Sequence, residues 1–179
     1  MSSALTLPSE LRTIIVMGVS GSGKSVVGGL LAEKLGGVFE DGDDFHPLSN
    51  KAKMSAGTPL TDEDRWPWYA VLRQRIEEMR GLTPVHVLAC SALKPAYRDR
   101  LRAEDPPNTL RFVLLDGTRE LITARMAARK GHFMPLSLLD SQLATLEPTP
   151  DLTRVSIDAT PDAIVEDILQ KLATASAKA

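Results

Sequence analysis

The chain has 179 residues, a formal net charge of −2 at pH 7 and a hydrophobic fraction of 43%, enough to build a sizeable core. This length suits one domain, and we expect residues 1–179 to fold as a single unit. The near-balanced charge gives no reason to expect nucleic acid or an anionic membrane as a partner. The first apolar run is too short to cross a membrane, and the single cysteine, Cys90, cannot form an internal disulfide. We therefore expect a cytoplasmic protein that acts on a small molecule.

Short apolar runs alternate with helical patterns along the chain. The runs lie at 13–17, 37–40, 85–90, 110–115 and 153–158, and the last helical pattern places Ile164, Ile168, Leu169 and Leu172 on one face. This alternation predicts an α/β fold, a three-layer sandwich in which helices flank a five-stranded parallel sheet. Two segments depart from it, at about 45–80 and 129–150. We expect them to form an acceptor-binding insert and a lid near the carboxyl ends of the strands.

The first apolar run leads into "GVSGSGKS", residues 18–25, which fits the P-loop pattern G-x-x-x-x-G-K-[ST]. Glycines let successive backbone N–H groups point at one phosphate, while Lys24 supplies an ammonium and the Ser25 hydroxyl can ligate Mg²⁺. The loop therefore predicts a bound nucleoside triphosphate. Its expected binding residues are Gly18, Ser20, Gly21, Ser22, Gly23, Lys24 and Ser25.

The second apolar run ends in "EDGDDFHP", residues 40–47. Alternate residues of an extended chain share a face, so we expect Asp41 and Asp43 to point toward the P-loop and Asp44 to point away. One carboxylate can hold Mg²⁺ while the other accepts a hydrogen bond from the hydroxyl that attacks the γ-phosphate. We assign Asp41 to the metal, with Ser25, and Asp43 to the acceptor hydroxyl. The alternative interpretation is an acidic surface turn.

These features favour a small kinase over a GTPase, since the segment "NKAK" lacks the aspartate of the N-K-x-D motif. Four segments resemble the gluconate kinases (gluconokinases) of the small P-loop kinase group: "MGVSGSGKS", "DGDDFHPLSNKAKMSAGTPLTDEDRWPW", "CSALKPAYRDRLR" and "ARKGHFMPLSLLDSQLATLEP". The resemblance covers about residues 12–173 and departs at Tyr69, where leucine is expected. It implies a P-loop kinase-like fold, a homodimer, and transfer of the γ-phosphate of ATP to the 6-hydroxyl of D-gluconate with Mg²⁺ as cofactor.

Gluconate is a polyol with a terminal carboxylate, so its site needs cations and several hydrogen-bonding groups. The matching segments supply candidates for both, and we expect substrate contacts from Asp43, His46, Lys53, Arg65, Lys94 and Arg98.

Two lid arginines, Arg125 and Arg129, are four residues apart and thus share a helical face. We expect both to reach the nucleotide, and Arg129 to reach the transferring phosphoryl group when the lid closes. Lys130 and His132 could extend this cationic lid or lie on the surface. The expected catalytic residues are Lys24, Asp43 and Arg129. Two other interpretations stay open: another small P-loop kinase, such as a shikimate-type enzyme, and a non-catalytic ATP-binding regulator.

Overall fold

A computed structural model describes residues 6–129 and 135–176. Its five strands form one all-parallel sheet in the order β2-β3-β1-β4-β5. The strands are β1 (Thr13–Met17), β2 (Val38–Asp41), β3 (His86–Ala89), β4 (Leu110–Asp116) and β5 (Thr153–Ser156). The helices are α1 (Lys24–Leu35), α2 (Leu48–Ser55), α3 (Asp62–Met79), α4 (Pro95–Arg102), α5 (Arg119–Ala128), α6 (Leu136–Thr145) and α7 (Pro161–Ser176), with a 3₁₀ turn η1 (Gly42–Phe45). The predicted parallel α/β sandwich is confirmed.

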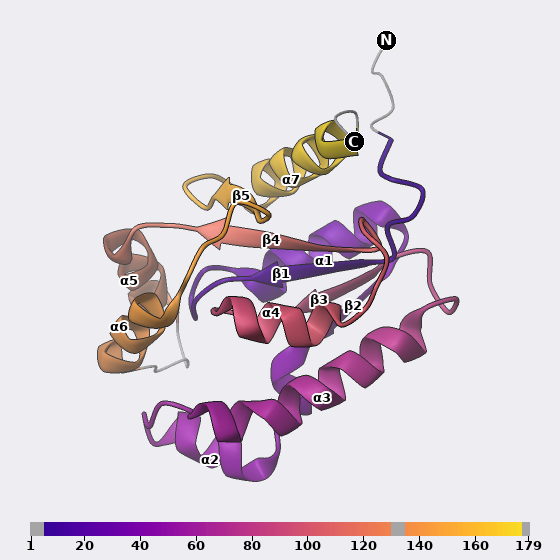
Figure 1. Cartoon of the computed structure of the whole chain (residues 1–179). Helices are drawn as coiled ribbons and strands as arrows, with labels where there is room; N and C mark the ends of the chain where they lie inside the picture. Colours follow the sequence, from indigo (N-terminus) through magenta and orange to yellow (C-terminus); the bar gives the residue numbers. More distant parts are fainter. Residues whose placement is uncertain (1–5, 130–134, 177–179) are drawn as a thin grey trace.

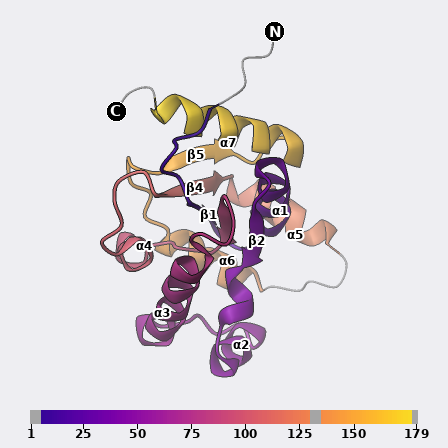
Figure 2. The same cartoon turned by 90° about the vertical axis from the view of Figure 1, so that its right-hand side faces the viewer.

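The central strand β1 is buried on both faces. Its side chains alternate between two cores: Ile14 and Val16 pack with residues of α1 and α7, whereas Ile15 and Met17 pack with residues of α3 and α4. Figures 1 and 2 show the same layers, with α1 and α7 on one face of the sheet and α3 and α4 on the other. Burial from both sides explains why this strand is a continuous apolar run in the sequence.

The last helix, α7, packs on the sheet as its periodicity predicts. Ile164, Ile168 and Leu172 are buried, and Leu169 packs partly buried against the same core. Each fully buried side chain of this kind contributes about 1.5–3 kcal/mol relative to an exposed one. This helix therefore helps to hold β5 and α1 together.

Three connections meet at the carboxyl ends of the strands. The P-loop joins β1 to α1, the turn η1 follows β2, and α5 follows β4, with α5 and α6 at the left of Figure 1. Gly21 has φ +80, and a Cβ there would lie 2.6 Å from Met126 Cγ of α5. Only glycine therefore fits where the P-loop passes close to α5.

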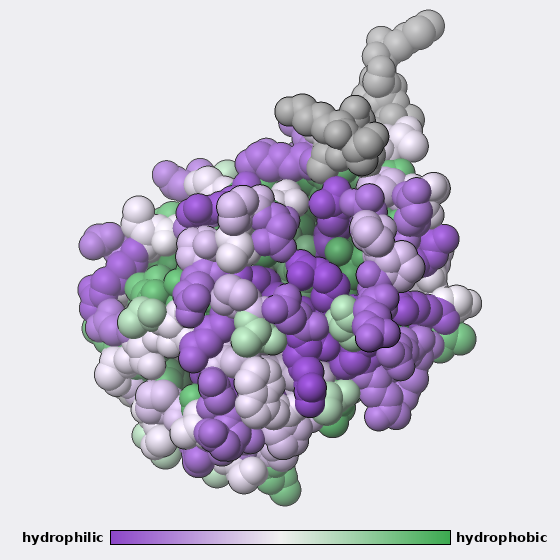
Figure 3. Space-filling model, viewed as in Figure 1, coloured by the Kyte–Doolittle hydropathy of each residue, from purple (hydrophilic) through white to green (hydrophobic). Residues whose placement is uncertain are grey.

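The surface shown in Figure 3 is mostly polar, with hydrophobic colour in small separate spots. Leu48 and Leu82 are the most exposed large apolar side chains among the described residues, at 84% and 75%. None of the described helices is long and apolar enough to cross a lipid bilayer.

Candidate active site

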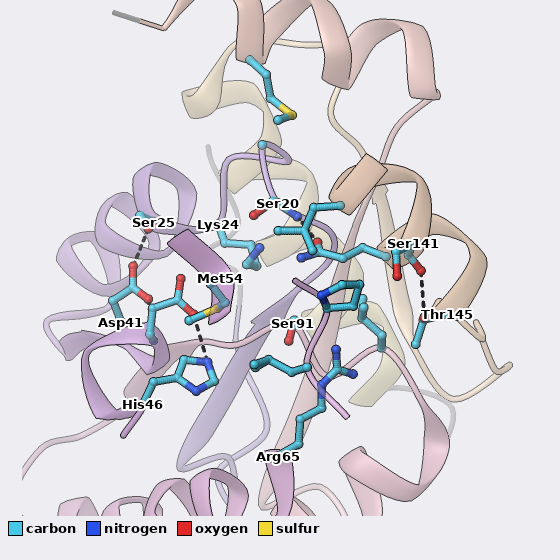
Figure 4. A pocket seen from close by; sticks show the side chains of 18 of the residues that line it. Ser20, Lys24, Ser25, Asp41, His46, Met54, Arg65, Ser91, Ser141 and Thr145 are labelled. Carbon is cyan, nitrogen blue, oxygen red and sulfur yellow. Dashed lines mark hydrogen bonds and ion pairs between the residues drawn. The ribbon is translucent and has the colours of Figure 1, made fainter. Parts of the chain in front are cut away.

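A cavity of about 430 Å³ lies beside the P-loop. Its walls come from the P-loop, the end of β2, the segment that contains α2 and the start of α3, and the helix α6. In Figure 4, Ser25 and Asp41 lie on one side, and Arg65 approaches the cavity from α3. The sequence candidates that line it are Ser20, Gly21, Gly23, Lys24, Ser25, Asp41, Asp43, His46, Arg65 and Arg129. The structure thus joins the nucleotide and acceptor candidates in one space.

The P-loop lysine is folded over its own loop. Lys24 Nζ donates to the carbonyl oxygens of Gly18, at 3.1 Å, and Val19, at 3.0 Å. Desolvation lowers the pKa of Lys24, and the nearby carboxylates of Asp43 and Asp41 oppose this shift. The fully buried Ser22 donates its hydroxyl hydrogen to Val19 O at 2.7 Å. Its side chain therefore stabilises the loop and does not line the cavity.

Ser25 and Asp41 form a compact pair of oxygen ligands. The Ser25 hydroxyl donates to Asp41 Oδ2 at 2.6 Å, and Asp41 Oδ1 accepts the N–H of Asp43 at 3.0 Å. Hydroxyl and carboxylate oxygens suit Mg²⁺, which keeps several other ligand positions for water and phosphate. The described residues contain no cluster of three or more His, Cys, Asp or Glu side chains able to hold a metal ion. A metal here would therefore depend on the nucleotide phosphates as well as on this pair.

Two aspartates face the cavity from a 3₁₀ turn, η1, and its preceding residue, and not from an extended chain. We expected an extended chain through Asp44, but Gly42–Phe45 forms a 3₁₀ turn. Asp41 and Asp43 still line the cavity, and Asp44 does not. Although 71% of the Asp43 side chain is exposed, desolvation by the surrounding protein raises its pKa, as do Asp41 and Asp44, while Lys24 lowers it. A raised pKa suits a carboxylate that accepts a proton.

His46 is a neutral hydrogen-bond donor held in a fixed orientation. Its ring stacks on Trp68 with centroids 3.8 Å apart, and Asn50 Nδ2 lies 3.2 Å from His46 Nδ1. Because Asn50 Nδ2 also donates to Asp64 O at 2.9 Å, it is an N–H group, so Nδ1 must accept and Nε2 carries the proton. Burial, with Arg65 and Lys51 nearby, lowers the pKa of His46 to about 4. The Nε2–H group lies 3.8 Å from Asp43 Oδ1.

The predicted substrate cations separate into two groups. Arg65 lines the cavity, whereas Lys53, Lys94 and Arg98 do not. Lys53 pairs with Asp64 at 2.7 Å, and Lys94 lies 3.6 Å from Asp62.

The expectation that Arg98 binds substrate needs correction. Its side chain is 1% exposed, and its guanidinium donates to the backbone carbonyls of Ala92, at 2.8 Å, and Glu147, at 2.7 Å. These bonds join α4 to the loop before it and to the segment after α6. The positive charge of Arg98 therefore serves the fold, and we do not retain Arg98 as a substrate residue.

The two lid arginines also differ. Arg125 donates to the carbonyl oxygens of Ile157 and Ala159, so it holds the loop after β5 and does not line the cavity. Arg129 caps the C-terminus of α5, is exposed, and lines the cavity. The expectations for Lys130 and His132 fall outside the described residues.

Several cavity residues escaped the sequence analysis. Gln142 of α6 accepts the backbone N–H of Ser20 through Oε1 at 2.7 Å, and Trp68 donates its indole N–H to Gly42 O at 2.8 Å. Trp68, Asn50 and Gln142 lie within the segments that resemble the gluconate kinases, so the resemblance marks their surroundings. Neither their residue types nor their spacing indicates a role for them.

Cys90 and Tyr69 lie in the core below the cavity. Burial raises the pKa of the Cys90 thiol to about 12, so the thiol is protonated at neutral pH. Tyr69, the position that departs from the resemblance, is 0% exposed and stacks on Tyr97 with ring centroids 5.0 Å apart.

Residues 20–173 match the family model described as shikimate kinase. A gluconokinase of Gluconobacter oxydans is 46% identical over 162 residues, which cover 89% of this chain and 90% of that protein. A probable gluconokinase of Xenopus tropicalis is 49% identical over 164 residues, covering 83% and 86%. The chain belongs to the gluconokinase family. A gluconokinase structure from Sinorhizobium meliloti agrees with a TM-score of 0.85 at 44% identity, covering 96% of this chain and 97% of that one. A shikimate kinase of Aquifex aeolicus shares the fold, at 19% identity and a TM-score of 0.54.

Proposed function

We propose that this gluconokinase-family protein transfers the γ-phosphoryl group of ATP to the 6-hydroxyl of D-gluconate, giving 6-phospho-D-gluconate and ADP. The observation that carries the proposal is a cavity in which Lys24 of the P-loop shares the walls with Asp43 and Arg65. Relatives named as gluconokinases or probable gluconokinases, at 41% to 49% identity, support the choice of acceptor. A shikimate-type acceptor and a non-catalytic role are less well supported by these relatives.

On the acceptor side, Arg65 is the candidate for the substrate carboxylate. A guanidinium binds a carboxylate through two parallel N–H donors, and Arg65 is the one cavity-lining cation among the candidates from the insert. The Nε2–H of His46 can donate to a substrate hydroxyl, because Nδ1 accepts from Asn50 and the ring hydrogen is therefore on Nε2. Asp43 would accept a hydrogen bond from the 6-hydroxyl.

During transfer, the 6-oxygen forms a bond to the γ-phosphorus while the bond from that phosphorus to the bridging oxygen breaks and ADP leaves. The hydroxyl proton passes to Asp43. Lys24 and Arg129 stabilise the negative charge of the phosphoryl group, which is spread over three oxygens in a loose transition state. Mg²⁺, held by Ser25, Asp41 and the nucleotide, would add positive charge at the phosphates.

Two further expectations are proposals from the family resemblance and the sequence: assembly as a homodimer and residence in the cytoplasm. Neither affects the assignment of the cavity residues.

The proposed function is tested by ADP release from ATP with D-gluconate, shikimate or AMP as acceptor, with Mg²⁺ and with excess EDTA. We expect turnover only with gluconate and Mg²⁺, and loss of turnover in a folded Lys24→Ala variant. Equal ADP release with and without gluconate, or faster release with shikimate, would contradict the proposal. Binding of ATP without turnover on any acceptor would favour the regulator.

A further inference from the structure

The hydroxyl of Tyr97 lies between Arg65 and Asp62. Arg65 donates from a terminal guanidinium nitrogen, Nη1, to Tyr97 Oη at 2.9 Å, and Tyr97 Oη donates in turn to Asp62 Oδ1. The carboxylate can only accept, so it fixes the direction of the hydroxyl hydrogen and leaves an oxygen lone pair toward Arg65. The three groups therefore form a chain of hydrogen bonds that ends at a guanidinium in the cavity wall.

The ring of Tyr97 is itself held firmly. The residue is 1% exposed, and its ring stacks on Tyr69 at an interplanar angle of 27°. The carbon of the Arg65 guanidinium lies 5.2 Å from the Tyr97 ring centroid, within the range of a cation–π contact. Because Tyr97 belongs to α4 and Arg65 to α3, the contact joins two helices, of which α3 contributes Arg65 to the cavity wall.

Arginine has a long side chain that loses considerable rotamer freedom when it binds a ligand in one geometry. A guanidinium that is already oriented loses less on binding. Arg65 has five N–H donors, and the bond to Tyr97 uses one of them, which leaves donors for a ligand. The tyrosine hydroxyl thus restricts Arg65 without blocking it.

We propose that Tyr97, oriented by Asp62, is a positioning residue that holds Arg65 ready for the carboxylate of a polyhydroxy acid. The inference rests on the proposed function, because it assumes that Arg65 meets the acceptor carboxylate. It assigns to Tyr97 no contact with the reacting atoms. The effect of Tyr97 should therefore appear in acceptor binding and not in the phosphoryl-transfer step.

The test compares two tyrosines of the same stack. Tyr97→Phe keeps the ring and removes the hydroxyl, so we expect KM for gluconate to rise about tenfold while kcat and KM for ATP change less than about twofold. Tyr69→Phe is the matched control, because it removes a hydroxyl from the other ring of the stack and leaves the bond between Tyr97 and Arg65 in place. We expect wild-type kinetics for the control and cooperative thermal unfolding for both variants.

A double-mutant cycle separates positioning from a general packing effect. In an Arg65→Ala background, Tyr97→Phe should cause no further rise in KM, because the group that it positions is absent. Asp62→Asn, which keeps the acceptor shape but removes the charge, should raise KM for gluconate more than Glu63→Gln in the same helical turn does.

Where the wild-type protein turns over gluconate, either of two results would overturn the positioning role. The first is an equal effect of Tyr97→Phe with and without Arg65, and the second is an unchanged KM for gluconate in Tyr97→Phe. A wild-type protein without gluconate-dependent turnover would instead overturn the proposed function, and the positioning role with it.

Discussion

At the scale of single residues, Asp43 and Asp44 are adjacent aspartates with different surroundings. Asp43 lines the cavity and Asp44 does not. Asp43→Asn keeps the shape of the side chain but removes the proton acceptor, so we expect kcat to fall about a hundredfold or more while ATP binding survives. Asp44→Asn should leave kcat within about twofold of wild type. Steady-state kinetics at saturating ATP and Mg²⁺ measure both. Equal losses of kcat in the two variants would contradict the assignment of Asp43, and not Asp44, to the acceptor hydroxyl.

The raised pKa of Asp43 also predicts a pH dependence. Only the ionised carboxylate accepts a proton, so kcat/KM for gluconate should fall as the pH drops through this raised pKa.

The same raised pKa changes stability in the opposite direction, because the free energy of unfolding falls as the pH rises. The folded protein binds the Asp43 proton more tightly than the unfolded chain does, so this group lowers stability as the pH rises through the same window. Asp43→Asn should therefore unfold at an equal or higher temperature than wild type at pH 7. A lower unfolding temperature would contradict the desolvation of Asp43.

Single residues also show which parts of the site the sequence could predict. Lys24 and Ser25 both line the cavity, because a contiguous motif sets its own geometry. Arg98 does not, and the sequence could not show this, since an arginine that binds substrate and one that binds buried carbonyl groups look alike in a sequence. The tautomer and ring orientation of His46 depend on Asn50 and Trp68, which only the packing of η1, α2 and α3 brings together.

At the scale of elements, the start of α3 determines where Arg65 lies. Thr61 Oγ1 accepts the N–H of Asp64 at 3.2 Å, and Asp64 Oδ2 accepts the N–H of Thr61 at 2.9 Å, which forms a capping box. Thr61→Ala should lower the free energy of unfolding by about 1 kcal/mol. Because Arg65 follows directly, KM for gluconate should rise as well.

Thr160→Ala is the control for this prediction. The Thr160 hydroxyl accepts the N–H of Ala163 at 3.3 Å at the start of α7, which contributes no residue to the cavity. Chemical denaturation and steady-state kinetics of both variants should show a similar loss of stability, with a raised KM only in Thr61→Ala. A raised KM for gluconate in both variants, or in neither, would contradict a specific link between the Thr61 cap of α3 and acceptor binding.

The elements themselves were largely predictable. All five strands lie within about two residues of the apolar runs. Burial on both faces explains the apolar sequence of β1 and β3, whereas the edge strands β2 and β5 include exposed and polar residues. The turn η1 was missed, since its residues, "GDDF", suit a turn as well as a strand end. Local preference alone did not decide between them.

At the scale of the whole molecule, the cavity connects parts that lie far apart in the chain. The P-loop supplies Lys24, the insert supplies Arg65, and α6 contacts the P-loop through Gln142 and the Ser20 N–H. A nucleotide phosphate in the P-loop would compete with Gln142 for this N–H group. The relative position of these elements follows from the strand order, which the sequence does not state.

The proposed reaction forms one new bond, between the 6-oxygen of gluconate and the γ-phosphorus of ATP. The direct measurement is NMR of the product made from ATP and D-gluconate labelled with ¹³C at carbon 6. We expect the carbon 6 signal to split by coupling to one phosphorus, with one ADP formed for each gluconate consumed, and no such signal from folded Lys24→Ala. ADP formation with an unsplit carbon 6 signal, or a phosphoryl group on another hydroxyl oxygen of gluconate, would contradict the proposed reaction.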